Sequence, residues 1–332
     1  MMNKDIKLCG LGNAIVDFQF EVSDEEINEL SLEKGTMTLV VDESQEKILK
    51  KMGNRTQYKS SGGSAANTVI AFSSFGGKAA YKSMIGEDND GSFYSSEFND
   101  LGIILDAKVD DNDHTGRCLV LISPDSERTM LTSLGATQNY NKDFISDKLI
   151  KRSEWLYIEG YKLTEDTGYE AALHACNVAR KYDTKIALTI SDKFIIDLFR
   201  DRLEKIAEFA DLIFCNEVEG KLFTEAIDSA DALDKLSNKY KNVAFTKGAN
   251  GSHILWDGRL YEIPPYEATP IDSTGAGDMY AGGFFYGLIY GESIERAGNL
   301  GSLAASRVVS QHGARLKESH TDLAKEIFSK FK

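Results

Sequence analysis

Short apolar runs alternate along the chain with longer segments that show a helical pattern of polar and apolar residues. Runs typical of buried strands occupy residues 6–11, 155–158, 185–189, 212–215 and 243–246. Helical patterns lie between them, for example at residues 168–182 and 194–209. Strands that alternate with helices indicate βαβ units, which build a parallel sheet covered by helices on both faces. The 332 residues suffice for about two domains, or for one large α/β domain with an appendage.

Two regions depart from this alternation and predict a separate group of strands. Apolar residues alternate with polar ones, as in half-buried strands, at Phe18, Phe20 and Val22 and again at Met37, Leu39 and Val41. A hairpin is predicted from residues 115–123 and 128–134 around the turn Pro124-Asp125-Ser126-Glu127. We interpret segments 17–42 and 107–134 as a small antiparallel β lid over one end of the main sheet. The alternative is that these strands are edge strands of that same sheet.

The chain is acidic, with 38 Lys and Arg against 52 Asp and Glu and a net charge of −14. Such a surface repels nucleic-acid backbones and anionic lipid, so we expect no nucleic-acid and no membrane partner. The apolar stretch at residues 279–291 is shorter than the roughly 20 residues that cross a bilayer. We expect no signal peptide and a cytoplasmic location. The four cysteines and five histidines lack the spacing of a zinc site.

A glycine-rich segment, Asp272-Ser273-Thr274-Gly275-Ala276-Gly277-Asp278, leads into the apolar stretch that we interpret as a buried helix. Small residues let backbone N–H groups approach a phosphate, and the helix N-terminus adds partial positive charge. Asp278 in the first turn is placed to deprotonate an acceptor hydroxyl as phosphate arrives. The alternative is a glycine-rich turn in which Asp278 is an ordinary N-terminal helix residue.

A second glycine-rich segment, Ser60-Ser61-Gly62-Gly63-Ser64-Ala65-Ala66-Asn67, opens another helix. Its paired glycines again permit close backbone approach. Asn67 lies one turn into the helix and offers both a donor and an acceptor to a polyol. The alternative is a tight strand-to-helix turn with a buried asparagine.

Together these segments resemble the PfkB, or ribokinase-like, family of carbohydrate and nucleoside kinases, over nearly the whole chain. Residues 10–17 are similar to the family's first strand, whose closing Asp17 holds substrate hydroxyls. Residues 62–67, with the later glycines 76, 77, 86 and 91, resemble its first signature, and residues 272–278 match its second. The resemblance implies one kinase domain over residues 1–332, with a ribokinase-like three-layer α/β fold. Its central sheet would be mainly parallel and flanked by helices, with the small β lid beside it.

The resemblance also implies ATP as phosphate donor and a set of residues that bind it. Asp278 would be the general base, and the amides of Gly275, Ala276 and Gly277 would form the anion hole. Asn216 and Glu219 match an N-x-x-E element that orders Mg²⁺ largely through water, which suits a hard cation. The alternative for this tetrapeptide is a solvated helix start.

Further positions follow from the same resemblance. Thr246, Gly248 and Gly251 would lie beneath the nucleotide phosphates, and Asn299 would lie on the helix that flanks adenine. Asp272 and Thr274 coincide with positions that bind an activating monovalent cation, K⁺, in many relatives.

The acceptor site resembles the adenosine-kinase branch of the family. Asn13 and Asp17, then Gly62, Gly63 and Asn67, would bind the substrate. Arg128 is similar to a hairpin arginine that closes over the site and can bind phosphate oxygens bidentately. The alternative is a solvated arginine beside Glu127. An apolar slot for a base is expected from the alternating lid residues Phe18, Phe20, Met37, Leu39, Val41, Leu119 and Leu121.

The leading hypothesis is an ATP-dependent kinase that phosphorylates a primary hydroxyl of a purine nucleoside, most simply adenosine to AMP. A ribokinase- or fructokinase-like sugar kinase is the nearest alternative. A non-catalytic nucleoside-binding protein would not need Asp278, the anion hole and the Mg²⁺ element together. An oxidoreductase is disfavoured because residues 10–15 lack the third glycine of G-x-G-x-x-G. The partner would be a small-molecule substrate, and we expect a monomer or a homodimer.

Overall fold

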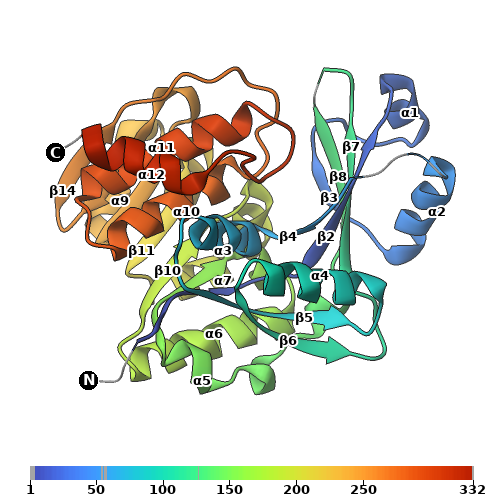
Figure 1. The fold of residues 1–332 in the computed structure, drawn as a ribbon, viewed down its shortest axis with the longest axis horizontal. Coiled ribbons are helices and arrows are strands. Elements are labelled where there is room, and N and C mark those ends of the chain that lie inside the picture. The colour runs from blue at the N-terminus through green and yellow to red at the C-terminus, as the bar shows by residue number, and fades with distance from the viewer. Residues whose placement is uncertain (1–3, 54, 56–57, 126, 331–332) are drawn as a thin grey trace.

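The computed structural model describes residues 4–53, 55, 58–125 and 127–330. The chain forms a nine-stranded sheet with helices on both faces and a second, five-stranded sheet beside it (Figure 1). The predicted α/β class, with a mainly parallel main sheet and a separate small sheet, is confirmed.

The main sheet contains all five strands predicted from apolar runs, with ends that differ by at most two residues. Its strands pair in parallel, except that β13 is antiparallel to both of its neighbours. In spatial order they are β14 (Arg259–Ile263), β13 (Ser252–Trp256), β12 (Asn242–Thr246), β11 (Leu212–Asn216), β10 (Lys185–Thr189), β9 (Ser153–Glu159), β1 (Ile6–Leu11), β5 (Ala79–Gly86) and β6 (Ile104–Asp110).

Helices cover the two faces of the main sheet in two groups, each with its own apolar core. Figure 1 shows α3 and α10–α12 on one side and α5 and α6 on the other. The first group is α3 (Ser64–Ser74), α4 (Asn89–Asp100), α10 (Ala276–Ile289), α11 (Ile294–Val309) and α12 (His320–Lys330). The second is α5 (Asp147–Ile150), α6 (Asp166–Lys181), α7 (Lys193–Ala207), α8 (Glu217–Thr224) and α9 (Ser229–Lys239).

Four short 3₁₀ helices complete the described core. They are η1 (Gly135–Asn139), η2 (Lys142–Phe144), η3 (Gly160–Leu163) and η4 (Gly248–Asn250). Within the described ranges, no helix is both long and apolar enough to span a membrane.

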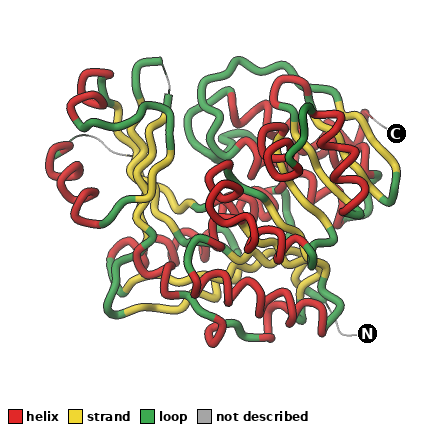
Figure 2. Tube along the Cα trace, turned by 180° about the vertical axis from the view of Figure 1, so that it is seen from behind, coloured by secondary structure: helices red, strands yellow, loops and turns green. Residues whose placement is uncertain are grey.

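The smaller sheet is the predicted lid, and Figures 1 and 2 show its strands standing apart from the main sheet. The predicted hairpin is present as β7 and β8, which pair antiparallel; Ser126 of its turn lies outside the described residues. The pairing is mixed, because β2 runs parallel to β7 and β3 parallel to β8. The strand order is β3 (Met37–Leu39), β8 (Arg128–Ser133), β7 (Gly116–Ile122), β2 (Ile15–Glu21) and β4 (Tyr58–Gly62).

The lid boundaries differ from the two predicted segments. Strand β4 adds a fifth strand that ends at the first of the paired glycines, Gly62, and it pairs with β2. Residues 107–110 belong instead to β6 of the main sheet, where they pair with β5. Helices α1 (Asp24–Glu29) and α2 (Asp42–Met52) also belong to the lid and cover its outer face. The sequence analysis predicted neither helix, although Ser23 and Glu26 have the spacing of the capping box that begins α1.

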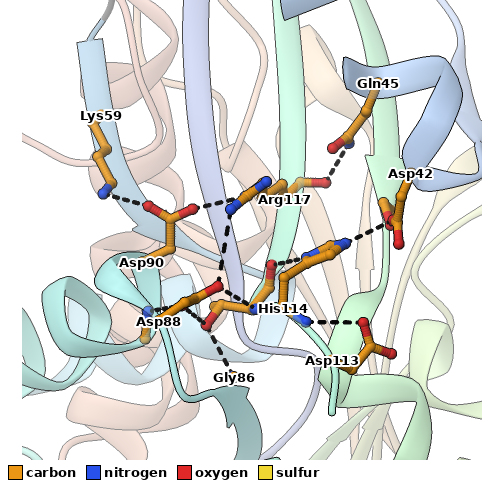
Figure 3. A network of polar contacts seen from close by, with 12 residues as sticks. Asp42, Gln45, Lys59, Gly86, Asp88, Asp90, Asp113, His114 and Arg117 are labelled. Atoms are coloured by element: carbon orange, nitrogen blue, oxygen red, sulfur yellow. Dashed lines mark hydrogen bonds and ion pairs between the residues drawn. The ribbon is translucent and has the colours of Figure 1, made fainter. Parts of the chain in front are cut away.

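A network of ion pairs holds the lid to the core beside the first turn of α4 (Figure 3). Asp90 of the core accepts hydrogen bonds from Arg117 Nε at 2.7 Å and Lys59 Nζ at 2.6 Å, both on lid strands. Asp88 caps α4 and accepts from the backbone N–H and hydroxyl of Thr115, at 2.9 and 2.7 Å. Because Thr115 directly precedes β7, these bonds fix the segment in which the chain passes from the main sheet to the lid.

Candidate active site

A cavity of about 610 Å³ lies between the lid and the carboxyl ends of the main-sheet strands. The last residues of β9, β10, β11 and β12 all line it: Glu159, Thr189, Asn216 and Thr246. Ligands of open α/β sheets bind at this edge, and the volume is typical of a small-molecule site. The first turns of α3 and α10, the start of α7, the segment at η3 and the inner face of the lid form further walls.

Helix α10 begins within the glycine-rich segment at residues 272–278, as predicted. Gly275 precedes it with a φ of 73°, in the left-handed region that favours glycine. No described side chain caps this helix, and Gly275, Ala276 and Gly277 line the cavity. A Cβ on Gly277 would meet no described atom within 4 Å, so the glycine leaves open space at the helix start. This arrangement suits an anion, because the helix terminus carries partial positive charge.

Asp278 joins the two glycine-rich helix starts. It lies in the first turn of α10 and accepts a hydrogen bond from Ser64 Oγ at 2.6 Å. Asn67 Nδ2 donates to its other carboxylate oxygen at 3.3 Å. Burial raises the pKa of Asp278 to about 6, although both hydrogen bonds lower it. The carboxylate lines the cavity, and the two hydrogen bonds fix its orientation. With a pKa of about 6 it is mostly ionised at neutral pH.

The paired glycines bring Asp17 next to the same cavity. A Cβ on Gly62 would lie 2.4 Å from Asp17 Oδ2, and one on Gly63 would lie 2.2 Å from the backbone oxygen of Asn13. Only glycine permits these approaches. Burial raises the pKa of Asp17 to about 7, while the cations Arg128 and Arg315 lower it.

Asn13 also lines the cavity, but its amide is already engaged by the protein. Its Oδ1 accepts from Lys162 Nζ at 3.1 Å and from the Thr137 hydroxyl at 3.2 Å. Its Nδ2 donates to the backbone oxygen of Tyr161 at 3.3 Å. These contacts describe a residue that orders the turn between β1 and β2, ahead of Asp17.

Glu159 is a site residue that the sequence analysis missed. The residue is 1% exposed, and its carboxylate accepts the backbone N–H groups of Asn13 and Ala65, each at 2.7 Å. Burial raises its pKa to about 7. These bonds tie the turn before β2 to the first turn of α3. The available signal was its place directly after the predicted strand 155–158, at the carboxyl end of a buried parallel strand.

Arg128 lies on β8 outside the cavity lining of the described chain, and it forms a buried ion pair with Asp272. The other bonds of Asp272 come from backbone N–H groups, of Thr274 at 3.0 Å and of Gly313 at 2.7 Å. The pair links the lid to the glycine-rich turn at residues 272–275, which precedes α10. Because Arg128 neutralises Asp272 here, this geometry adds no support for a monovalent cation at Asp272 and Thr274.

Asn216 and Glu219 form a capping box at the start of α8, so the segment is a helix start as the alternative held, but Glu219 is buried rather than solvated. Asn216 Oδ1 accepts the Glu219 N–H at 2.9 Å, and the Glu219 carboxylate accepts the Asn216 N–H at 3.0 Å. Both side chains also line the cavity. Burial, together with the neighbouring carboxylates of Asp192 and Asp278, raises the pKa of Glu219 to about 7, although the hydrogen bond from the Asn216 N–H lowers it.

The charge of the cavity wall favours a bound cation. In the described chain the lining has five carboxyl groups and one cationic side chain, Lys193. A phosphate-bearing ligand would be repelled by this excess of acid unless a divalent cation balanced it. The oxygen donors of Asn216 and Glu219 suit Mg²⁺, which keeps much of its water shell.

Of the other residues predicted to bind the nucleotide, only one lines the cavity. Thr246 lines it, whereas Gly248, Gly251 and Asn299 lie outside the lining found for the described residues. Asn299 is buried, accepts from Tyr266 OH at 2.9 Å and donates to the Glu295 carbonyl at 2.8 Å. The nucleotide role of these three residues stays a prediction.

The lid presents a different apolar face to the cavity from the one predicted. Phe18, Phe20, Leu119 and Leu121 pack instead with apolar residues of α1 and α2 on the outer side of the sheet. Val41 is 69% exposed, whereas Met37 and Leu39 do line the cavity. Since side chains alternate across a strand, the inner face carries the intervening residues. These are Ile15, Asp17, Cys118, Met130, Thr132 and Leu134.

Comparisons with known proteins identify the family of the chain. The chain is 27% identical to an adenosine kinase of Saccharomyces cerevisiae over 92% of this chain and 95% of that protein. An adenosine kinase structure from Sinorhizobium meliloti shares 30% identity with a TM-score of 0.90, covering 97% of this chain and 99% of that one. A probable sugar kinase from Rhizobium etli CFN 42 shares 30% identity with a TM-score of 0.91, covering 98% and 99%. With residues 35–321 also matching its family model, the chain belongs to the pfkB family of carbohydrate kinases.

Proposed function

We propose that this phosphotransferase moves the γ-phosphate of ATP to a primary hydroxyl of a purine nucleoside, with adenosine as acceptor and AMP as product. The observation that carries the proposal is the oriented Asp278 carboxylate at the open end of α10. It lines the same cavity as Asp17 and the apolar inner face of the lid. A non-catalytic nucleoside-binding protein has no use for a carboxylate held in this way.

The chemistry assigned to this chain is proton removal and charge stabilisation. Asp278 takes the proton of the acceptor hydroxyl, and a base with a pKa of about 6 is suited to this at neutral pH. The amides of Gly275, Ala276 and Gly277 stabilise negative charge on the migrating group, assisted by the helix terminus. Mg²⁺, when bound, supplies charge neutralisation on the phosphates, and Asn216 and Glu219 would hold it through water.

The acceptor assignment combines polar and apolar walls. Asp17 and Asn67 can bind vicinal ribose hydroxyls, a contact that a nucleoside and a free sugar share. The lid adds Met37, Cys118 and Met130, an apolar surface that suits a base and that a free sugar would not fill. The similarity to proteins named adenosine kinase over nearly the full chain supports the nucleoside.

A sugar kinase is the second candidate. The Rhizobium etli structure, described as a probable sugar kinase, favours this candidate, because its similarity to the chain equals that of the Sinorhizobium meliloti adenosine kinase structure in identity and nearly in TM-score. An ADP-release assay with adenosine, inosine, guanosine, ribose and fructose, at fixed ATP and Mg²⁺, separates the two candidates. We expect turnover with adenosine and a product phosphorylated on the 5′-oxygen by ³¹P NMR. Turnover with sugars alone would replace the nucleoside proposal with the sugar one.

Potassium activation and the oligomeric state remain predictions of the family resemblance. Replacing KCl with NaCl at constant ionic strength tests the cation role of Asp272 and Thr274. Light scattering on the purified chain separates a monomer from a homodimer.

A further inference from the structure

The loop at residues 313–315, which follows α11, contacts two separate parts of the site. Gly313 N–H donates to Asp272 Oδ2 at 2.7 Å. A Cβ on Gly275 would lie 2.5 Å from the Cβ of Ala314, so the loop packs directly on the anion-hole turn. The next residue, Arg315, reaches the lid strand β4. One short segment therefore contacts both the phosphate end and the acceptor end of the cavity.

Arg315 and Glu97 both bind Ser61 on β4, an outermost strand of the lid sheet. Glu97 Oε2 accepts the Ser61 N–H at 2.8 Å. Arg315 Nη2 donates to the Ser61 carbonyl at 2.5 Å and to its hydroxyl at 2.6 Å. Arg315 Nη1 pairs with Glu97 Oε1 at 2.5 Å. The ion pair thus supplies an acceptor and a donor to Ser61, as a neighbouring strand would supply them.

The residue held in this way precedes the glycine that contacts Asp17. A Cβ on Gly62 would lie 2.4 Å from Asp17 Oδ2, so a small shift of Ser61 and Gly62 changes the wall beside that carboxylate. The hydroxyl of Tyr94, on α4, donates to the Gly62 carbonyl at 3.1 Å and fixes the same wall from the core. Arg315 also lowers the pKa of Asp17, which burial raises.

We propose that Arg315 is a positioning residue that holds the acceptor wall at Ser61 and Gly62 in register with the anion-hole turn at Gly275. The proposal rests on the proposed function, in which Asp17 binds the acceptor. A guanidinium suits this role because its planar fork contacts a carbonyl, a hydroxyl and a carboxylate at once. Lysine would keep the charge but not this geometry.

Steady-state kinetics of two Arg315 variants separates geometry from charge. In both Arg315→Lys and Arg315→Met we expect the acceptor KM to rise about tenfold, as for loss of a hydrogen bond to a charged group, and the ATP KM to change less than twofold. Arg307→Met is the matched control, because Arg307 is exposed and pairs with Glu318 at 3.6 Å in the same region. A wild-type acceptor KM in both folded Arg315 variants would overturn the proposal.

The pH profile gives a readout that a purely structural role would not change. Arg315→Met removes a cation that favours ionised Asp17, so the acid limb of the acceptor kcat/KM should move to higher pH. Arg315→Lys keeps the charge and should leave the limb in place. An unmoved limb in Arg315→Met would contradict the placement of Arg315 beside Asp17.

Hydrogen exchange tests the inference independently of the acceptor. Without ligands, the Ser61 amide should exchange faster in Arg315→Met and Arg315→Lys than in wild type and in Arg307→Met. Unchanged exchange in both variants would refute the positioning role whatever the acceptor is. Absence of wild-type turnover with every nucleoside would instead refute the proposed function and leave the exchange result to decide this inference.

Discussion

Ser64 and Asp278 are 214 residues apart in the chain, and Ser64 Oγ donates a hydrogen bond to Asp278 Oδ1 at 2.6 Å. This bond joins the first turns of α3 and α10, the two glycine-rich helix starts. Asn67 donates to the second carboxylate oxygen, so two side chains of α3 fix the orientation of the carboxylate. Both bonds favour the ionised form, against the burial that raises the pKa to about 6.

Replacing Ser64 with alanine should move the acid limb of kcat to higher pH. The lost hydroxyl stabilised ionised Asp278, so the pKa rises above about 6 and activity is lost earlier as the pH falls. We expect kcat at pH 7 to fall about tenfold. Ser74→Ala is the control, because Ser74 is on the last turn of the same helix and donates to the Ile70 carbonyl at 2.9 Å. If the acid limb of kcat lies at the same pH in Ser64→Ala and Ser74→Ala, the Ser64 hydroxyl does not stabilise ionised Asp278.

Replacing Glu219 with glutamine should raise the Mg²⁺ concentration needed for half-maximal activity several-fold, because a neutral amide holds the metal's water shell less strongly. Glutamine still accepts the Asn216 N–H, so the helix cap is kept. Glu217→Gln changes the same charge at the start of the same helix, outside the cavity lining found for the described residues, and serves as control. A Mg²⁺ titration equal to that of the control would place Glu219 outside the metal site.

Shortening the side chain of Met130 should lower kcat/KM for nucleosides more than for sugars. Met130 lines the cavity from the lid and pairs across the sheet with Met37. Met130→Ala should lower kcat/KM for adenosine about tenfold, as expected for roughly 50 Å² of lost apolar contact at about 25 cal/mol per Å². Leu131→Val, on the helix-covered side of the same strand, should lower stability without changing the adenosine-to-ribose ratio. Equal losses for adenosine and ribose in Met130→Ala would argue against a base slot here.

Closure of the lid on the acceptor should be visible by hydrogen exchange. A kinase must keep water from the transferring phosphoryl group, and lid closure supplies that exclusion. We expect protection at residues 115–134 and 37–41 to rise when a proven acceptor saturates the enzyme. No change in either segment at saturation with a proven acceptor would contradict closure of the lid.

Five strands of the nine-stranded main sheet and the two helix starts were predictable because their causes are local. A buried parallel strand requires a continuous apolar run, which residues 6–11 and 185–189 show directly. The turns before α3 and α10 require backbone conformations that favour glycine, and Gly63 and Gly275 have φ values of 103° and 73°. Local sequence therefore placed Asp278 in the correct helical turn.

The lid faces were not predictable in the same way. Period-two alternation separates Phe18 from Asp17, but it does not say which set faces a cavity and which faces covering helices. The answer depends on α1 and α2, which bring only a few buried residues, such as Ile27 and Ile48, to the outer face of the lid. The parallel pairing of β2 with β7 likewise joins segments about 100 residues apart and has no local signal.

Glu159 and Arg315 show a second limit of sequence reasoning. Each is an isolated charged residue whose role comes from partners distant in the chain. Glu159 accepts the N–H of Ala65, and Arg315 binds Ser61 across 254 residues. Only the folded chain brings these groups together, so no motif marks them.

Phosphate transfer by Asp278→Asn tests the central claim most directly. The variant keeps the shape of the side chain and removes the base, so kcat with adenosine should fall by about 10²–10⁴. ATP affinity by calorimetry and the thermal midpoint should stay close to wild type, because the amides of Gly275, Ala276 and Gly277 are intact. Near-normal turnover by the folded variant would contradict the account and remove Asp278 from the reaction.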